Sequence, residues 1–198
     1  MNMDHQSSPT FEDQVEELKA KFGKPQVFTF SADFLNFECD LVKRSAAKGR
    51  NHDITCFIRK DGQYVVIQKH QYAQTGIYRA PSGGAYPDED LEDAAEREMY
   101  EETGLQVDLK KFVMDVRLEV RCPDETIPWR SLVFLAEAVN GDLHIIDDYE
   151  IYNVRLMSRE EMLGSVDELM VESGWGGFEY RSFLTRSFFE TLDELDDG

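Results

Sequence analysis

The sequence has no long apolar run and few basic residues, and each lack excludes a class of protein. No segment approaches the roughly 18 consecutive apolar residues of a membrane-spanning helix, and the first residues are polar, unlike a secretory signal. The chain has 21 Lys and Arg against 40 Asp and Glu, a formal charge of -19, and such a field repels nucleic acids and anionic membranes. These features predict a cytoplasmic protein without stable nucleic-acid or membrane binding.

Cysteine and histidine are also scarce. The three cysteines, Cys39, Cys56 and Cys122, are widely spaced and contain no Cys-x-x-Cys pair, so they indicate neither a zinc site nor a redox couple. The four histidines likewise lack the spacing of metal ligands. We therefore expect reduced, structural thiols and assign the histidines no chemistry.

The composition suits one domain of ordinary size. At 198 residues, with 41% hydrophobic and 12% aromatic residues, the chain can bury enough apolar surface to offset the entropy lost on folding. An acidic surplus often only keeps a surface soluble. An anionic substrate, by contrast, would need local help, which bound divalent cations supply.

Apolar periodicity and turn residues predict a mixture of helices and strands. Helices are expected over residues 11–22, 91–103, 158–163 and 178–195; strands are expected over residues 26–30, 34–42, 53–58, 64–69, 105–120, 130–139 and 150–156. Asp61 and Gly62 indicate a hairpin turn, and Ser158 with Glu161 forms a capping-box pattern. This order predicts an α/β or α+β sandwich.

The most informative segment is residues 81–105, PSGGAYPDEDLEDAAEREMYEETGL. On a helix, one apolar stripe is formed by Leu91, Ala94, Ala95 and Met99. Glu98, Glu101 and Glu102 fall on that same stripe, so three like charges crowd together at the helix C-terminus, where the helix dipole also opposes them. A positive group is therefore expected beside these carboxylates.

A divalent cation and Arg97 are the two candidates for that positive group. Mg²⁺ takes oxygen ligands from carboxylates, carbonyls and water, and it usually shares its coordination shell with substrate phosphates. Arg97 would instead neutralise part of the cluster as an ordinary ion pair. The helical geometry alone leaves both alternatives open.

The same segment fills every defined position of the Nudix pattern, G-x5-E-x7-R-E-U-x-E-E-x-G-U, where U is apolar. The matching residues are Gly83, Glu89, Arg97, Glu98, Met99, Glu101, Glu102, Gly104 and Leu105. A pattern of this length is far more specific than a short motif. The chain therefore resembles the Nudix hydrolases. The resemblance implies a mixed β-sheet sandwich between helices, with Mg²⁺, or Mn²⁺ in its place, promoting hydrolysis of a diphosphate linkage.

The resemblance also implies a role for each motif residue. The implied metal ligands are Glu98, Glu101, Glu102 and the carbonyl of Gly83; the implied catalytic residues are Glu98, Glu101 and Arg97; the implied structural residues are Glu89, Gly84 and Gly104. Glu89 and Arg97 carry complementary charges and would hold the loop against the helix. Gly104 suits a helix end that needs a positive φ.

The general base stays open between two places. Bound cations lower the pKa of a coordinated water and neutralise the charge that develops at phosphorus. Nudix relatives take the base either from the motif helix or from a later loop. Glu98 is the first choice and Glu150 the second, with Asp147 and Asp148 near it; for any one of these loop residues, a solvated acidic loop is the simpler interpretation.

The substrate must be read from outside the motif. Residues 65–84 broadly resemble the corresponding region in hydrolases of ADP-ribose and related nucleoside diphosphate sugars, through Gln68, Lys69 and Tyr72. The resemblance implies a nucleoside diphosphate linked to another moiety, with ADP-ribose as the first candidate. Two alternatives stay open: a hydrolase of nucleoside triphosphates or dinucleoside polyphosphates, and a Nudix module that senses a nucleotide without cleaving it.

Two features depart from those ADP-ribose relatives. Arg79 stands where they often carry an acidic residue, and Pro123 or Pro128 only approximates their downstream proline. The planar donor fork of Arg79 suits a phosphate, so we expect it to bind substrate, with a surface arginine as the alternative. Residues 121–128 are expected to interrupt strand pairing and form a substrate lid. Four aromatic residues are left unassigned, because aromatics near strands more often belong to the core: Tyr72, Tyr78, Tyr86 and Trp129.

The beginning of the chain resembles the N-terminal extension of the same relatives, which often serves dimerisation. We expect residues 1–50 to form a helix-and-strand extension and residues 51–198 to form the Nudix domain. A homodimer is the expected assembly.

Overall fold

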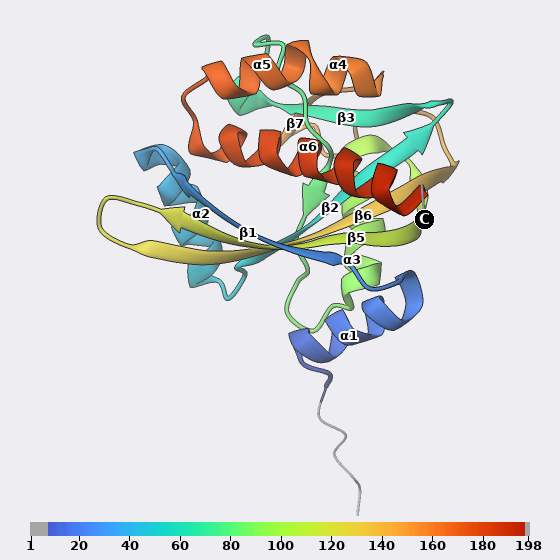
Figure 1. Ribbon diagram of the computed structural model, residues 1–198, viewed down its shortest axis with the longest axis horizontal. Coiled ribbons are helices and arrows are strands. Elements are labelled where there is room, and N and C mark those ends of the chain that lie inside the picture. The colour runs from blue at the N-terminus through green and yellow to red at the C-terminus, as the bar shows by residue number, and fades with distance from the viewer. Residues whose placement is uncertain (1–7, 197–198) are drawn as a thin grey trace, which may run out of the picture.

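In the computed structural model, which describes residues 8–196, helices cover both faces of a β-sheet (Figure 1). One layer contains α1 (Phe11–Phe22) and α3 (Leu91–Thr103). The opposite layer contains α4 (Arg159–Leu163), α5 (Ser165–Glu172) and α6 (Gly176–Asp196). The predicted mixed sheet between helices is confirmed. Residues 1–7 and 197–198 of the two predicted units lie outside the described residues.

The sheet has seven strands and mixes parallel with antiparallel pairs. The strands are β1 (Gln26–Asp33), β2 (His52–Lys60), β3 (Gln63–Lys69), β4 (Ser82–Gly83), β5 (Gln106–Arg121), β6 (Thr126–Asn140) and β7 (Ile151–Met157). Their order is β1-β5-β6-β2-β3-β7, and β4 pairs with β2. β1 runs parallel to β5, and β2 runs parallel to β6; the other neighbours are antiparallel.

Local hydrogen bonds explain where the helices begin and end. Thr10 caps the start of α1: its side-chain oxygen accepts a hydrogen bond from the amide of Asp13 at 3.2 Å, and the Asp13 carboxylate accepts one from the amide of Thr10. α3 begins at Asp90, which caps the amide of Glu92 at 2.8 Å. It ends at Gly104, whose φ of 75° ordinary residues rarely adopt. Both helices have the predicted bounds.

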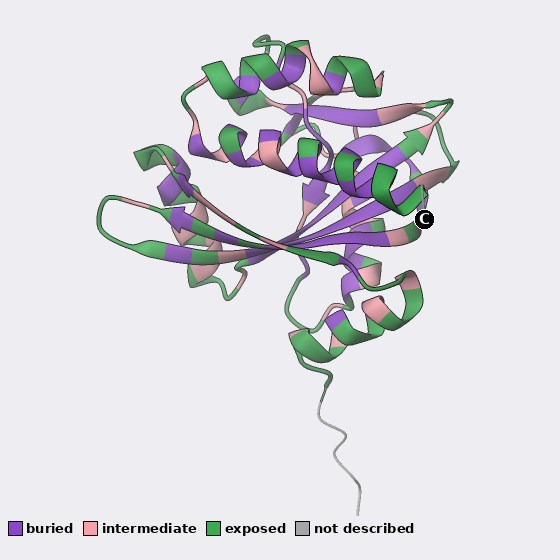
Figure 2. Cartoon of the chain, in the orientation of Figure 1, coloured by how far each residue is buried: buried purple, intermediate pink, exposed green. Residues whose placement is uncertain are grey.

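The central strands supply two apolar cores, one on each face of the sheet (Figure 2). On β2, Ile54, Cys56 and Ile58 pack with α1 and α3, whereas Phe57 points to the opposite face. The ring of Phe57 stacks on that of Phe188 in α6 with centroids 3.8 Å apart. The sheet therefore holds α3 and α6 in fixed positions on opposite sides. No helix between residues 8 and 196 is long and apolar enough to cross a membrane.

α2 (Asn36–Ala47) corrects the predicted strand over residues 34–42, and α5 was not predicted at all. The carboxylate of Glu38 accepts a hydrogen bond from the amide of Leu35 at 2.9 Å, which stabilises the first turn of α2. The same carboxylate accepts the amides of Gly176 and Gly177, at 3.2 and 2.9 Å, where α6 begins. A tertiary contact at Glu38 thus stabilises this helix. The aromatic residues of the segment favour strands, and for that reason a strand was predicted here.

The expectation of three reduced thiols is wrong for two of them. Cys39 in α2 and Cys122 in the turn after β5 form a disulfide, with Cα atoms 6.0 Å apart. Lys43 adds an ion pair from α2 to Asp124 at 2.9 Å. The fold brings together cysteines 83 residues apart, which spacing along the chain does not reveal. Cys56 is free and buried, and burial raises the pKa of its thiol.

The predicted lid is the tip of a β-hairpin. β5 continues to Arg121 and β6 begins at Thr126, so only four residues, 122–125, lie outside the strands. Pro128 does not interrupt the pairing, because it lies opposite Glu119 within the ladder. With the disulfide and the Lys43 ion pair at its tip, this hairpin is anchored to α2, and the prediction of a lid is wrong.

A buried ion pair between β5 and β6 gives a test of the fold. Arg130 donates to both oxygens of Asp115, at 2.8 and 2.7 Å, and both side chains are buried. Replacing Arg130 by Met removes both hydrogen bonds to the buried carboxylate and leaves only Arg117, whose Nε lies 3.7 Å away. Arg130→Met should therefore lower the free energy of unfolding by about 3 kcal/mol. The measurement is urea denaturation. The double variant Arg130→Met, Asp115→Leu should recover most of the loss, and equal losses in both proteins would refute this explanation.

Candidate active site

The three motif carboxylates lie at the C-terminal end of α3 and differ in their burial. Glu102 is 3% exposed, and its Oε2 accepts a hydrogen bond from the amide of Ser82 at 2.9 Å. Glu98 and Glu101 are partly buried. Burial is the main cause that raises the pKa values of Glu98 and Glu102. The predicted inward acidic cluster is therefore present, and burial disfavours the charge of two of its members.

Gly83 in β4 lies directly against one of these carboxylates. A Cβ at this position would overlap the carboxyl group of Glu98. The backbone here is fixed, because Gly83 pairs with Ile54 of β2 and Ser82 pairs with Thr55. Glycine is thus needed for close approach of the chain to Glu98.

Arg97 connects the loop after β4 to the acidic end of α3. It donates to both oxygens of Glu89, at 2.7 and 2.8 Å, and to the carbonyl of Gly84 at 3.1 Å. Its Nη1 also donates to Glu98 at 3.0 Å and Glu101 at 3.1 Å. The hydrogen bonds from Arg97 lower the pKa of Glu89. This one guanidinium holds the loop and orients two carboxylates.

The donor set of the cluster is that of a hard divalent cation. Carboxylate oxygens and a nearby backbone carbonyl are the ligands that Mg²⁺ takes, and a cation offsets the cost of burying Glu98 and Glu102. The glycine at position 83 leaves the space next to Glu98 that a side chain would fill. Within residues 8–196, no three Asp, Glu, His or Cys side chains are grouped closely enough to hold a metal ion as they are placed. Nη1 of Arg97 contacts both Glu98 and Glu101, at 3.0 and 3.1 Å. The residues fit the ion by chemistry.

Basic side chains from distant parts of the chain lie around the cluster, and apart from Lys69 they have no signal in the sequence. Lys69, at the end of β3, forms an ion pair with Glu150 at 2.7 Å and lies 3.7 Å from Glu102. Arg50 lies so close to Gly84 that a Cβ there would overlap its side chain. Arg181 reaches the same region from α6 and donates to Ser82 Oγ at 3.1 Å. No local motif marks these residues; only the fold brings them together.

Arg79 is buried, which contradicts the alternative of a surface arginine. It is 8% exposed, and its Nε donates to the hydroxyl of Tyr72 at 3.1 Å. Its Nη1 donates to the carbonyl of Ala80 at 3.0 Å and to Ser82 Oγ at 2.8 Å. The amide of the same Ser82 donates to Glu102. Ser82 therefore contacts both Arg79 and a carboxylate of the acidic cluster.

The acidic residues before β7 have separate tasks. The side chain of Asp147 accepts hydrogen bonds from the amides of Tyr149 and Glu150, at 3.2 and 3.3 Å, and so forms a turn. The Asp148 carbonyl contacts the ring of His70 at 3.0 Å. Of these three residues, Glu150 forms an ion pair with a basic residue near the cluster, Lys69, at 2.7 Å. The charge of Lys69 lowers the pKa of Glu150.

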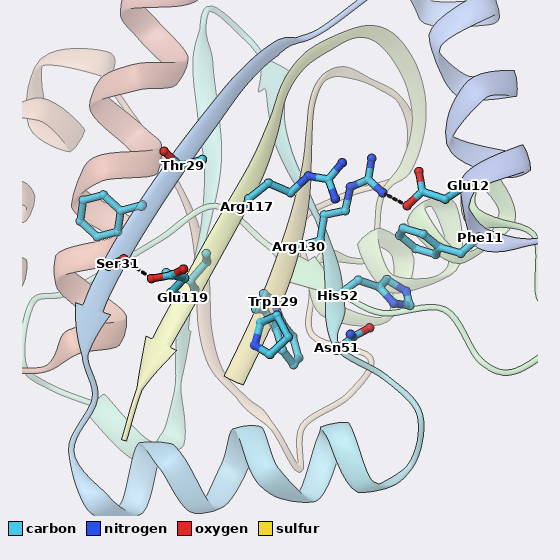
Figure 3. Close-up of a pocket in the computed structure, with 13 residues that line it drawn as sticks. Phe11, Glu12, Thr29, Ser31, Asn51, His52, Arg117, Glu119, Trp129 and Arg130 are labelled. Carbon is cyan, nitrogen blue, oxygen red and sulfur yellow. Dashed lines mark hydrogen bonds and ion pairs between the residues drawn. The ribbon is translucent and has the colours of Figure 1, made fainter. Parts of the chain in front are cut away.

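A wider hollow of about 660 Å³ lies between α1 and the sheet (Figure 3). Arg117 and Arg130 extend side by side across it, and Arg130 is already paired with Glu12 and Asp115. His52 connects this hollow to the glycine loop after β4, because its Nε2 accepts a hydrogen bond from the amide of Ala85 at 3.2 Å. The polar wall of the hollow is thus largely paired within the protein.

The unassigned aromatic residues are divided between core and polar contacts. Tyr72 is buried against Arg79, and the hydroxyl of Tyr78 accepts a hydrogen bond from Asn153 at 2.7 Å. Tyr86 is exposed, and the guanidinium of Arg97 lies over its ring. Trp129 Nε1 donates to Asp53 at 2.9 Å.

The NUDIX domain model matches residues 49–174, which include the acidic cluster, the glycine loop and most of the sheet. The chain belongs to the Nudix family of hydrolases. A curated relative in Schizosaccharomyces pombe, an NAD-capped RNA hydrolase, is 28% identical over 120 residues. That match covers 58% of this chain and 29% of the relative, so the chain corresponds to less than a third of its length.

Solved structures support the fold of this Nudix protein. A Nudix hydrolase from Nitrosomonas europaea superposes with a TM-score of 0.53 and 19% sequence identity. The superposition covers 73% of this chain and 88% of the other. At that identity the likeness concerns the fold, and it agrees with the mixed sheet between helices described above.

The contact between Gly83 and Glu98 predicts the effect of one added methyl group. Gly83→Ala should displace the Glu98 carboxylate while leaving β4 paired, and a displacement of about 1 Å costs on the order of 10²-fold in rate. Steady-state kinetics with a diphosphate substrate measures the rate, and thermal denaturation verifies the fold. Full activity in a folded Gly83→Ala protein would show that Glu98 does not need this position.

His52 predicts a pH dependence of stability. Burial lowers its pKa below the ordinary value of 6.5, so the unfolded chain binds a proton at a higher pH than the folded protein does. The free energy of unfolding should therefore be greatest above that value and fall as the pH drops below it. His52→Gln should remove this part of the slope. Urea denaturation of both proteins between about pH 7.5 and 5.5 measures it, and parallel curves would contradict the assignment.

Proposed function

We propose that this Nudix protein hydrolyses a diphosphate linkage in a nucleoside diphosphate joined to another moiety, with ADP-ribose as the first candidate. One observation carries the proposal: three partly or fully buried carboxylates lie at the end of α3, two of them, Glu98 and Glu102, contact the backbone of β4, and basic side chains lie beside the cluster. Carboxylates suit a divalent cation, and the basic side chains suit phosphates.

In this proposal the metal ligands are Glu98, Glu101, Glu102 and the carbonyl of Gly83, and the ion is Mg²⁺, for which Mn²⁺ can substitute. When bound, the ion acidifies a water molecule and neutralises charge that develops on the diphosphate. Arg97 holds Glu98 and Glu101 in position through its hydrogen bonds at 3.0 and 3.1 Å. Glu89 and Gly84 fix Arg97 from the loop side, and Gly104 ends the helix.

Glu98 is the proposed proton acceptor for the attacking water. Its carboxyl group lies against the loop backbone at Gly83, where the substrate diphosphate would approach the ion. Glu150 is the second candidate, but its carboxylate is engaged by Lys69 at 2.7 Å. Kinetics of Glu98→Gln and Glu150→Gln distinguish them, because loss of the base lowers kcat whereas loss of a Lys69 partner changes mainly KM.

Arg79 is the proposed substrate-binding residue, because a buried guanidinium close to the cluster suits a phosphate. The relative named as an NAD-capped RNA hydrolase supports a substrate with a nucleoside diphosphate linkage. Nucleoside triphosphate or dinucleoside polyphosphate hydrolysis, and nucleotide sensing without cleavage, are the alternatives.

We also propose that residues 1–50 form an extension of the catalytic unit and that the protein is a homodimer. Within the described residues, β1 pairs in parallel with β5, so this extension lengthens the sheet. Light scattering at several protein concentrations tests the dimer.

Mass spectrometry of the products tests the reaction. The substrates are ADP-ribose, other nucleoside diphosphate sugars, NAD and other dinucleotides, and triphosphates, each with Mg²⁺ and with a chelator. AMP and ribose 5-phosphate from ADP-ribose, formed only with the metal, would support the leading substrate. Preferred cleavage of another compound would replace the substrate, and nucleotide binding without any cleavage would favour the sensor.

Glu101→Gln tests the acidic cluster. The variant should lower kcat by about 10²-fold or more, since it removes a metal ligand, while the fold persists because repulsion between neighbouring carboxylates is relieved. Glu96→Gln is the matched control, because Glu96 lies on the exposed side of the same helix. Unchanged turnover in Glu101→Gln, or an equal loss in Glu96→Gln, would remove the site assignment.

A further inference from the structure

A second, smaller hollow of about 200 Å³ lies between α2, the 3₁₀ turn η1 (His70–Tyr72) and the start of α6. Its lining includes Lys69, Tyr72, Arg79, Trp175, Phe178 and Arg181. Three of these residues are basic and three are aromatic. The carboxylate of Glu38 also lines the hollow, where its oxygens accept backbone amides. In a chain with a charge of -19, three basic side chains around one small hollow stand apart from the general charge balance.

Two guanidinium groups form the inner wall and share one acceptor. Arg79 and Arg181 both donate to Ser82 Oγ, at 2.8 and 3.1 Å. Arg181 also donates to Thr55 Oγ1 at 2.9 Å, and its nearest carboxylate oxygen belongs to Asp53 at 3.5 Å. Like charges this close repel each other. The nearby carboxylates of Asp53 and Glu102 offset part of this repulsion, but neither makes a short, two-pronged ion pair with an arginine. An anion is the group that would complete this arrangement.

Each guanidinium retains a donor for such an anion. Nη2 of Arg79 and Nε of Arg181 make no hydrogen bond to any residue between positions 8 and 196. Arg79 as a whole residue is 92% buried, and its unpaired nitrogen is not among the fully enclosed polar atoms, so a ligand in the hollow can reach it. Phosphate oxygens accept hydrogen bonds from the planar fork of arginine in suitable geometry.

The hollow adjoins the acidic cluster. Lys69 lines the hollow and lies 3.7 Å from Glu102, and Ser82 bonds both arginines while its amide donates to Glu102 at 2.9 Å. A phosphate held by the arginines would therefore be the neighbour of a phosphate at the metal ligands. Two adjacent anionic groups are what a diphosphate supplies.

The outer wall is aromatic. Trp175 stacks on Phe178 with centroids 4.9 Å apart and meets Phe37 edge to face at 4.8 Å. Phe37 is 43% exposed, and Leu41, one turn later on α2, also lines the hollow and is exposed. Exposed aromatic surface beside a cationic wall suits a planar ring attached to a phosphate, because bases stack on aromatic side chains.

We propose that this hollow binds the nucleoside monophosphate half of the substrate, with Arg79 and Arg181 on its phosphate and Trp175 and Phe37 beside its base. The inference rests on the proposed function and adds the residues that select the substrate. Glu38, which bonds both α2 and the start of α6, and the disulfide at Cys39 keep the two walls in place before binding.

Binding of AMP tests the proposal without turnover. In the Glu101→Gln protein, AMP should quench tryptophan fluorescence, and Trp175→Phe should abolish the quenching although Trp129 remains. Arg181→Gln should raise the Kd for AMP by about tenfold or more, and Arg181→Lys by less, because lysine keeps the charge without the fork. Arg44→Gln, an exposed arginine of α2, is the control and should leave the Kd unchanged.

Kinetics in the otherwise unaltered protein gives a second readout. Arg181→Gln should raise KM for the nucleoside diphosphate substrate by about tenfold with a smaller effect on kcat, since the arginine lies in the hollow and not among the proposed metal ligands. Ribose 5-phosphate, which lacks a base, should bind at least tenfold more weakly than AMP. Thermal denaturation verifies folding, and Trp175→Leu replaces any arginine variant that unfolds.

The outcomes separate the two proposals. An unchanged Kd and KM in folded Arg181→Gln, with metal-dependent cleavage intact, would overturn this pocket and leave the proposed function standing. AMP binding that depends on Arg181, without cleavage of any diphosphate, would retain the pocket and refute the hydrolase. A third outcome is that Phe37→Ser abolishes self-association and leaves the Kd for AMP unchanged. The hollow would then be a contact between two copies of the chain, and the proposal would be overturned.

Discussion

The hydrogen bonds of Ser82 join three parts of the protein that lie far apart in the sequence. Its amide binds Glu102 at the end of α3, and its hydroxyl accepts Arg79 from the preceding loop and Arg181 from α6. β4 contains only this residue and Gly83, and its pairing with β2 sets the position of both. Burial strengthens each polar contact and makes an unpaired group costly, so the position of β4 constrains the carboxylates and the arginines together.

The charge distribution follows from this arrangement. A surplus of acidic residues gives the molecule a charge of -19, which by itself slows the approach of a nucleotide. Near the cluster the balance differs, because Lys69, Arg79 and Arg181 lie beside the carboxylates. A divalent cation bound to the carboxylates would make the local charge more positive. Phosphate binding as proposed would therefore depend on short-range contacts rather than on the field of the whole protein.

The sequence predicted what local patterns encode. α1 and α3 have the expected bounds because capping residues and apolar spacing mark them, and the acidic cluster follows from the periodicity of one helix. α2 was mistaken for a strand, since Phe34 and Phe37 favour extended structure while a tertiary contact at Glu38 stabilises the helix. Arg181 could not be found in advance, because only the packing of α6 against β2 brings it to Ser82.

The disulfide between Cys39 and Cys122 encloses the motif in a covalent ring. The ring spans 83 residues along the chain and contains β2, β3, β4, α3 and all of β5, and thus the motif segment at residues 81–105. A single break in the backbone between these cysteines, for example by a protease, would open the chain without separating its two pieces. Reduction as well as cleavage would be required to release either half.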